Sequence, residues 1–320
     1  MPTIYEFQPT AWIRVTGEDA PTFLQSQFSN ELQQTGPNPV VYGLWLTRKG
    51  KTCADSFIFR RAEKEFLVFS YFCPAATIID KMEANLIADE VELENLTSTV
   101  TGISWWGDEA KSFLNHLGLN EPLAGSFIEA DGKYLMRGRR SESVNYDLIV
   151  PKDQTEALIS QFDASDATAK VIRASDDELH WERLKSRIPA IPHDIGSDDL
   201  PQEGELEDDA ISFDKGCFLG QEVMARLHSM GRVQRKIFPV YSEGPLISTL
   251  PCDLFDQKNI VGQLRSAASD GKSWIGHALL KDRSRDTSGL SLIANDAPRV
   301  YIDRSRRSKV QSKKSVDFLC

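Results

Sequence analysis

The sequence lacks the features that mark membrane, secreted and nucleic-acid-binding proteins. Its apolar runs stay far below the ~20 residues that a membrane-spanning helix needs. The opening residues, MPTIYEFQPTAWIRV, carry no basic stretch followed by an apolar one, so no secretory signal is predicted. The net charge of −10 argues against general binding of nucleic acid, because phosphate contacts require a basic face.

The cysteines are few, odd in number and scattered, and no two of them form a C-x-x-C pair. This pattern favours free thiols in a reducing compartment over a disulfide framework, and with the missing signal it predicts a cytoplasmic protein. No zinc site or complete iron–sulfur site can be read from the spacing, since a cluster normally takes several cysteine ligands, and no stably bound metal is expected. The cysteines are Cys53, Cys73, Cys217, Cys252 and Cys320.

Two stretches of the chain resemble each other, residues 17–24 and 107–114. Both read glycine, two acids, alanine, a variable residue, a hydroxyl residue and then Phe-Leu. Each follows a short apolar run and is expected to open a helix, whose dipole favours acids near its start. A duplication of this kind predicts two related α+β halves, and chance convergence of two helix starts is the alternative.

The remaining pattern supports two halves. Strand-like runs at 40–47, 53–60 and 65–70 precede an expected helix at 74–88 and a strand at 90–96. The second half repeats this order with strands at 126–130 and 133–137 around an Asp131-Gly132 turn, a strand at 146–150 and a helix at 152–162. Ser175 and Glu178 form a capping-box pattern, which predicts a helix running to about residue 185.

The last third of the chain changes character. Residues 188–214 contain nine acids and no lysine or arginine, and an extended segment is predicted there, with a solvated linker as the plain alternative. Short strands at 236–241, 260–266, 273–280 and 290–294 predict a small antiparallel β-barrel. The expected domains are 1–97, 98–230 and 231–303, followed by a basic tail at 304–320 that is either disordered or binds a partner.

One short motif, KGCFLGQE, places a cysteine between two glycines. The glycines allow positive φ and the close approach of another group. The adjacent lysine is a cation, which favours thiolate over thiol. The motif therefore predicts a functional thiol, and the alternative is a tight turn around a cysteine that packs as a small hydrophobe. Its defining residues are Lys215, Gly216, Cys217, Gly220, Gln221 and Glu222.

This motif, continued to Arg226 as KGCFLGQEVMAR, resembles the signature of the YgfZ family of folate-binding proteins. That family includes the mitochondrial iron–sulfur assembly factors and is related to the T-protein of the glycine cleavage system, an aminomethyltransferase. The resemblance implies an α+β fold with two split-βαβ (ferredoxin-like) halves and the C-terminal β-barrel. It also implies tetrahydrofolate or a derivative as cofactor, and iron–sulfur enzymes or cluster carriers as partners.

The resemblance also assigns residues to the folate. In the T-protein family a glutamate in a P-x-E element accepts two hydrogen bonds from the amidine edge of the pterin. Here that element is PQE at residues 201–203, which gives Glu203 this role. Relatives usually carry glycine where Arg187 stands in this chain. Three arginines are candidates for the anionic folate tail or for bridging the barrel to the core: Arg226, Arg232 and Arg235.

One departure from the family bears on activity. T-protein relatives carry two adjacent aspartates in a G-x-x-x-D-D-L element, and the matching stretch here keeps Asp55 but has Ala54 in the other place. A lone aspartate at a strand start is otherwise an ordinary turn or surface residue. The broken pair favours a folate-binding protein that supports assembly or repair of iron–sulfur clusters, including those of tRNA-modifying enzymes. Cys217 and Asp55 are its candidate catalytic residues, and a tetrahydrofolate-dependent aminomethyltransferase is the alternative.

Overall fold

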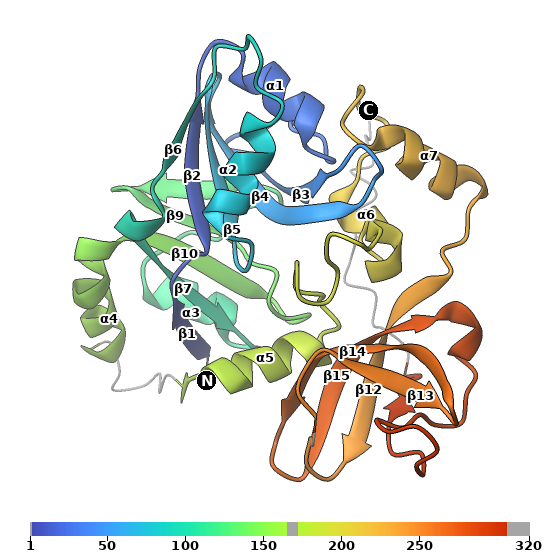
Figure 1. The fold of residues 1–320 in the computed structure, drawn as a ribbon. Coiled ribbons are helices and arrows are strands. Elements are labelled where there is room, and N and C mark those ends of the chain that lie inside the picture. Colours follow the sequence, from blue (N-terminus) through green and yellow to red (C-terminus); the bar gives the residue numbers. More distant parts are fainter. Residues whose placement is uncertain (1, 165–171, 247, 306–320) are drawn as a thin grey trace, which may run out of the picture.

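The computed structural model describes residues 2–164, 172–246 and 248–305, which form a body with two sheets and a C-terminal lobe with a third (Figure 1). The first sheet contains β2 (Ala11–Thr16), β3 (Val40–Leu46), β4 (Thr52–Ala62), β5 (Glu65–Ser70) and β6 (Glu92–Asn95). The second contains β1 (Thr3–Phe7), β7 (Val100–Trp106), β8 (Phe127–Ala130), β9 (Lys133–Arg137), β10 (Asn145–Pro151) and β11 (Ile172–Arg173).

The two sheets repeat one topology. The first has the order β3-β4-β5-β2-β6, and the second has β8-β9-β10-β7 followed by β1 and β11. Helices α1 (Ala20–Gln27) and α3 (Ala110–His116) follow the equivalent strands β2 and β7, as the repeated sequence predicts. Helices α2 (Ala75–Glu83) and α4 (Thr155–Ala164) follow β5 and β10. The predicted α+β fold with two related halves is confirmed.

The N-terminal strand lies in the sheet of the other half. Strand β1 pairs antiparallel with β7 and parallel with β11, so residues 3–7 belong to the second sheet and not to the 1–97 half expected to contain them. The two sheets also meet in an aromatic core, in which the Trp12 ring lies 5.5 Å from Phe59 and 5.2 Å from Tyr134. The halves therefore share both a strand and a core.

The acidic segment 188–214 packs on the first half. Ile191, Ile195 and Leu206 are fully buried in the same core as α1 and β3. The segment contains only short helical turns, η3 (Pro201–Gly204) and α6 (Glu207–Ala210). The solvated-linker alternative is wrong, because apolar residues between the acids anchor the segment. Its buried acids are Asp194, Asp199 and Glu203.

The C-terminal lobe is a barrel-like antiparallel sheet with the order β13-β14-β15-β12-β16. Its strands are β12 (Arg235–Glu243), β13 (Cys252–Asp256), β14 (Asn259–Ser269), β15 (Ser273–Lys281) and β16 (Tyr301–Ile302). The strand expected at 290–294 is absent from the described residues and is replaced by two isolated bridges, Leu290 to Val300 and Ser291 to Phe255. These bridges place this segment between the two edge strands.

A buried ionic cluster fastens the lobe to helix α5 (Asp176–Lys185), which begins with the predicted capping box at Ser175. Asp194 accepts hydrogen bonds from Arg183 Nη1 at 2.5 Å and from Ser266 of β14, and its Oδ2 lies 3.1 Å from His277 Nδ1 of β15. Burial alone would raise the pKa of Asp194, but Arg183 and His277 outweigh it and the pKa lies far below its ordinary value.

Candidate functional site

The cysteine motif forms a tight turn that leads into α7 (Gln221–Met230), a helix that the sequence did not predict. Gly220 has φ of +89°, and a Cβ there would lie 2.7 Å from the carbonyl oxygen of Thr47, so the turn packs directly on the β3–β4 connection. Only glycine fits such a position. A Cβ at Gly216 would meet nothing within 4 Å, and Cys217 is exposed. The motif therefore exposes its thiol at the surface, next to a turn that packs closely on the first half.

Lys215 has a different role from the one that its position suggested. Its Nζ donates to the carbonyl oxygens of Gln25 at 2.8 Å, Phe28 at 2.7 Å and Asn30 at 2.8 Å. These carbonyls belong to the end of α1 and the residues after it, so the ammonium ties the motif to the first half. Burial lowers the pKa of Lys215 to about 8. The side chain is fixed by backbone groups and is not directed to the neighbouring thiol.

Thiols elsewhere in the described chain are less accessible than Cys217. Cys53 and Cys252 are half-buried, and Cys73 is buried. Burial raises the pKa of Cys73 strongly, with the nearby Asp55 carboxylate adding to the effect. Cys320 and most of the predicted basic tail lie outside the described residues. Among described cysteines, Cys217 alone is exposed.

Glu203 is buried and already engaged. Its Oε1 accepts from Arg235 Nε at 2.8 Å, and its Oε2 accepts from Arg235 Nη2 at 3.1 Å and from the backbone N–H of Leu200 at 2.7 Å. Arg235 also donates to Asp199 Oδ1 at 3.0 Å. Because Arg235 begins β12, this bidentate pair connects η3 to the C-terminal lobe, the bridging role considered for this arginine. A pterin would have to displace Arg235 to use the same carboxylate oxygens.

Asp55 lies inside the first half, and the turn-or-surface alternative for it is wrong. Its Oδ2 accepts from the Tyr42 hydroxyl at 2.9 Å, and its Oδ1 lies 3.3 Å from the Cys73 thiol. Burial raises the pKa of Asp55, and the hydrogen bond from Tyr42 opposes that effect. The Arg139 guanidinium stands 4.4 Å from the centre of the Tyr42 ring. Within the described residues, no hydrogen bond or ion pair joins Asp55 to Glu203 or Cys217.

The remaining predicted residues lie on or near α7. Arg226 and Glu222 form an exposed pair one helical turn apart at 3.1 Å. Gln221 is the first residue of this helix, and Arg232 lies just beyond its end. Arg226 is therefore a surface residue, and Arg232 lines a cavity between α7 and the start of the C-terminal lobe.

A cavity of about 310 Å³ between the second sheet and α5 was not predicted from the sequence. Tyr5, Phe72 and Arg140 are among its lining residues. Arg140 is only 4% exposed, and its guanidinium lies 4.2 Å from the Phe7 ring and 4.0 Å from the Tyr71 ring. The cavity thus combines aromatic walls with a buried cation.

The guanidinium of Arg140 has few polar partners within the protein. Its Nε has no hydrogen-bond partner, and the nearest carboxylate oxygen, Asp147 Oδ1, is 3.8 Å away. Both oxygens of Asp147 are engaged by the hydroxyls of Ser104 and Tyr71. His180, in the same cavity, has its pKa lowered to about 4 by burial and then by Arg183, so it is neutral near pH 7. The signal in the sequence that could have pointed to this cavity is the pair of arginines at 139–140, which follows the predicted strand at 133–137.

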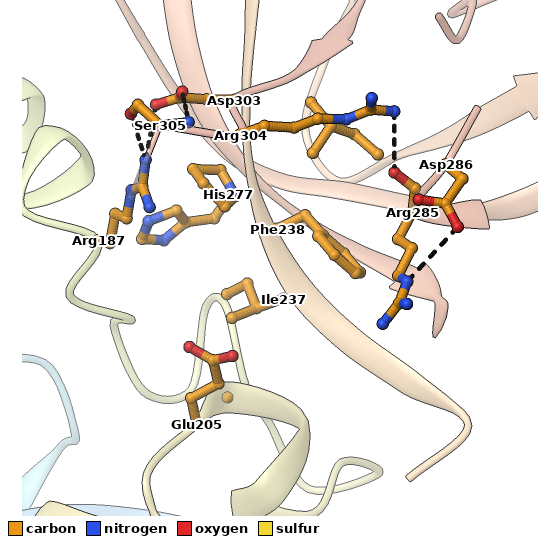
Figure 2. Close-up of a pocket in the computed structure, with 13 residues that line it drawn as sticks. Arg187, Glu205, Ile237, Phe238, His277, Arg285, Asp286, Asp303, Arg304 and Ser305 are labelled. Carbon is orange, nitrogen blue, oxygen red and sulfur yellow. Dashed lines mark hydrogen bonds and ion pairs between the residues drawn. The ribbon is translucent and has the colours of Figure 1, made fainter. Parts of the chain in front are cut away.

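A larger cavity, of about 390 Å³, opens between the body and the C-terminal lobe (Figure 2). Figure 2 shows Arg187 directed toward Asp303 and Ser305. Its Nη2 donates to Asp303 Oδ2 at 2.9 Å and to the Ser305 hydroxyl at 2.8 Å. Arg187 has φ of +55°, which lies in the left-handed region. Glycine, the residue expected at this position in relatives, adopts that region without strain. None of the predicted site residues lines this cavity.

The fold of this protein is similar to that of a known class of enzymes. The crystal structure of the glycine cleavage system aminomethyltransferase T from Bartonella henselae superimposes with a TM-score of 0.80, at 16% identity, over 96% of this chain and 86% of that one. The family model described as the GCVT N-terminal domain matches residues 3–129. The architecture is therefore that of the aminomethyltransferase fold.

Similar sequences narrow the class. The mitochondrial iron–sulfur cluster assembly factor IBA57 of Mus musculus is 24% identical over 88% of this chain and 78% of its own length. The tRNA-modifying protein YgfZ of Aliivibrio fischeri is 23% identical over 74% of this chain and 70% of its own length. These matches confirm the resemblance to the superfamily of YgfZ and the glycine cleavage T-protein. No helix among the described residues is long and apolar enough to cross a membrane.

Proposed function

We propose that the protein binds a reduced folate and supports assembly or repair of iron–sulfur clusters in other proteins, including tRNA-modifying enzymes. The observation that carries this proposal is the exposed Cys217, held at the surface by Gly220 and Lys215 on an aminomethyltransferase fold. Similarity to an assembly factor and to a tRNA-modifying protein supports it. One thiolate is too few ligands for a cluster, so Cys217 would share cluster or sulfur with a partner protein.

The cavity around Arg140 fits the chemistry of a folate. Tyr5 and Phe72 supply aromatic rings to its lining, and the guanidinium of Arg140, whose Nε has no hydrogen-bond partner and whose contact with Asp147 is as long as 3.8 Å, suits a carboxylate. Asp176 and Asp177 line the same cavity and supply acceptors for ring N–H groups. Folate would thus order the body, while Cys217 stays accessible to a partner at the surface. Glu203 remains the second candidate for the pterin.

Calorimetric titration with tetrahydrofolate tests the folate proposal and the Glu203 assignment together. If Glu203 holds the pterin, Glu203→Gln should weaken binding by about tenfold or more, through loss of a charge-assisted interaction. Arg235→Gln is the control, because it breaks the same ion pair but keeps the carboxylate free for the ligand. Equal folate affinity in the wild type and both variants would show that Glu203 only bridges η3 to the lobe. No binding by the wild type would refute the folate proposal itself.

The second candidate function is aminomethyl transfer to tetrahydrofolate. It is favoured by the buried Asp55, whose raised pKa suits proton exchange, and by 22% identity to an aminomethyltransferase of Caldanaerobacter subterraneus over 70% of this chain. Against it stands Ala54, which removes the second acid.

We therefore expect no aminomethyl transfer at rates typical of T-proteins, since one acid of the pair is missing. The assay supplies an aminomethyl-lipoyl carrier and tetrahydrofolate and follows methylene-tetrahydrofolate. Ala54→Asp, which restores the pair, is the informative variant. Rapid turnover by the wild type, abolished in Asp55→Asn, would establish the enzyme function instead.

A further inference from the structure

A third cavity, of about 470 Å³, lies where α7 meets the start of the C-terminal lobe. Gln202 of η3 and Glu207 of α6 line it from the body. Lys236 of β12 and Arg285, which follows η4 (Asp282–Ser284), line it from the lobe. Arg232, in the connection between the two, completes the cationic lining. None of the residues proposed above to hold folate lines this cavity, apart from Arg232 as one candidate for the tail.

Two buried acceptors in this cavity lack partners. Gln202 is 7% exposed, its Nε2 donates to Met224 Sδ at 3.4 Å, and its Oε1 has no hydrogen-bond partner. Turning the amide over would leave Nε2 without an acceptor instead, so one polar atom stays unpaired in either orientation. Glu207 Oε2 is also buried without a partner. Buried polar atoms are nearly always paired, so two unpaired acceptors in one cavity point to a donor from outside the chain.

The cations on the other side of the cavity have few partners in the protein. Arg232 is exposed and has no hydrogen bond or ion pair within the described part of the chain. Lys236 is half-buried, and its charge opposes the effect of burial, which raises the pKa of Glu207. Arg285 pairs only with the exposed Asp286, at 3.6 Å. Asp282 also lines the cavity and is its second acidic group.

This mixture of groups restricts the ligand. A simple anion would satisfy the cations but would leave the Gln202 and Glu207 oxygens unpaired and would face two carboxylates. A simple cation would be repelled by three positive side chains. A ligand with both an ammonium group and carboxylates matches both sets, and the cavity is larger than one small amino acid needs.

We propose that this cavity binds a short acidic peptide with a free amino terminus. Its ammonium and amide N–H groups donate to Gln202 and Glu207, and its carboxylates accept from Arg232, Lys236 and Arg285. The site lies against the C-terminal half of α7, the helix that begins in the cysteine motif, so an occupant would stiffen the connection between that helix and the lobe.

Isothermal calorimetry with triglutamate, in the absence of folate, tests the proposal. We expect binding with a dissociation constant below about 1 mM, and about tenfold weaker binding by Arg232→Gln, which removes an exposed side chain and should not disturb folding. Gln202→Leu, of similar volume, should weaken binding because it removes the unpaired acceptor. Lys272→Gln, an equal charge change in the exposed β14–β15 turn, is the matched control and should bind as the wild type does.

N-acetyl-triglutamate and triglutamine separate the two halves of the recognition. The acetylated peptide should bind more weakly, because it lacks the ammonium, and triglutamine should lose most of the affinity. The proposal is wrong if the wild type does not bind triglutamate, if acetylation has no effect, or if Lys272→Gln weakens binding as much as Arg232→Gln. These outcomes are independent of folate binding, since no folate is present.

Discussion

Replacing Lys215 with methionine should lower the free energy of unfolding by about 3 kcal/mol, because three backbone carbonyls lose their hydrogen-bond donor at once. Methionine has similar volume and packing, so the loss reports the hydrogen bonds to Gln25, Phe28 and Asn30. Denaturant unfolding followed by circular dichroism measures it. Lys51→Met, whose Nζ makes a single exposed bond to the Asp198 carbonyl, is the control and should have little effect.

The same variant predicts a pH dependence. Burial lowers the pKa of Lys215 to about 8, whereas in the unfolded chain it returns to the ordinary 10.5. Between these values the unfolded chain binds more protons than the folded one, so this lysine makes wild-type stability rise with pH. Methionine abolishes that contribution. The stability difference between wild type and variant should therefore widen from pH 8 to 10.5, and a difference independent of pH would contradict the burial of the ammonium.

Lys215→Met also tests the thiol-activation hypothesis drawn from the sequence. If the ammonium is committed to the carbonyls, the folded variant should alkylate at Cys217 as fast as the wild type at mildly acidic pH. A clear slowing, with the fold intact, would restore the lysine as an activating cation.

The second large effect concerns Cys217→Ser. In cells that depend on this protein, the variant should restore the activity of iron–sulfur enzymes no better than an empty control, because serine keeps the turn but cannot offer a thiolate. Folding and folate affinity should stay at the wild-type level, since Cys217 is exposed and no proposed folate contact involves it. The readouts are enzyme activity in the complemented cells, thermal unfolding and calorimetry.

Cys252→Ser is the matched control for this experiment, because that thiol is half-buried in β13 of the lobe and lacks the motif. It should complement fully. Full complementation by Cys217→Ser as well would mean that KGCFLGQE is a structural turn. In mass-spectrometric labelling of the native protein, Cys217 should react before Cys53 and Cys252, and buried Cys73 should react last.

The sequence by itself determined the features that depend on neighbours along the chain. The helix starts after Gly17 and Gly107, the capping box at Ser175 and the strand patterns are local signals, and the structure confirms them except for the strand expected at 290–294. The cysteine motif was readable for the same reason, because its residues are consecutive. The burial of the acidic segment was not predicted, because its high charge concealed the apolar residues between the acids that pack in the core, among them Ile191, Ile195 and Leu206.

Only the tertiary structure decided what the charged side chains contact. Lys215 finds carbonyls 185 to 190 positions away along the chain, and Glu203 finds Arg235 across the boundary with the lobe. Arg140 lies buried against the Phe7 ring because β1 pairs with the second sheet, and its Nε is left without a hydrogen-bond partner. A long flexible side chain reaches several partners, and folding selects among them by burial and geometry, which no local pattern records.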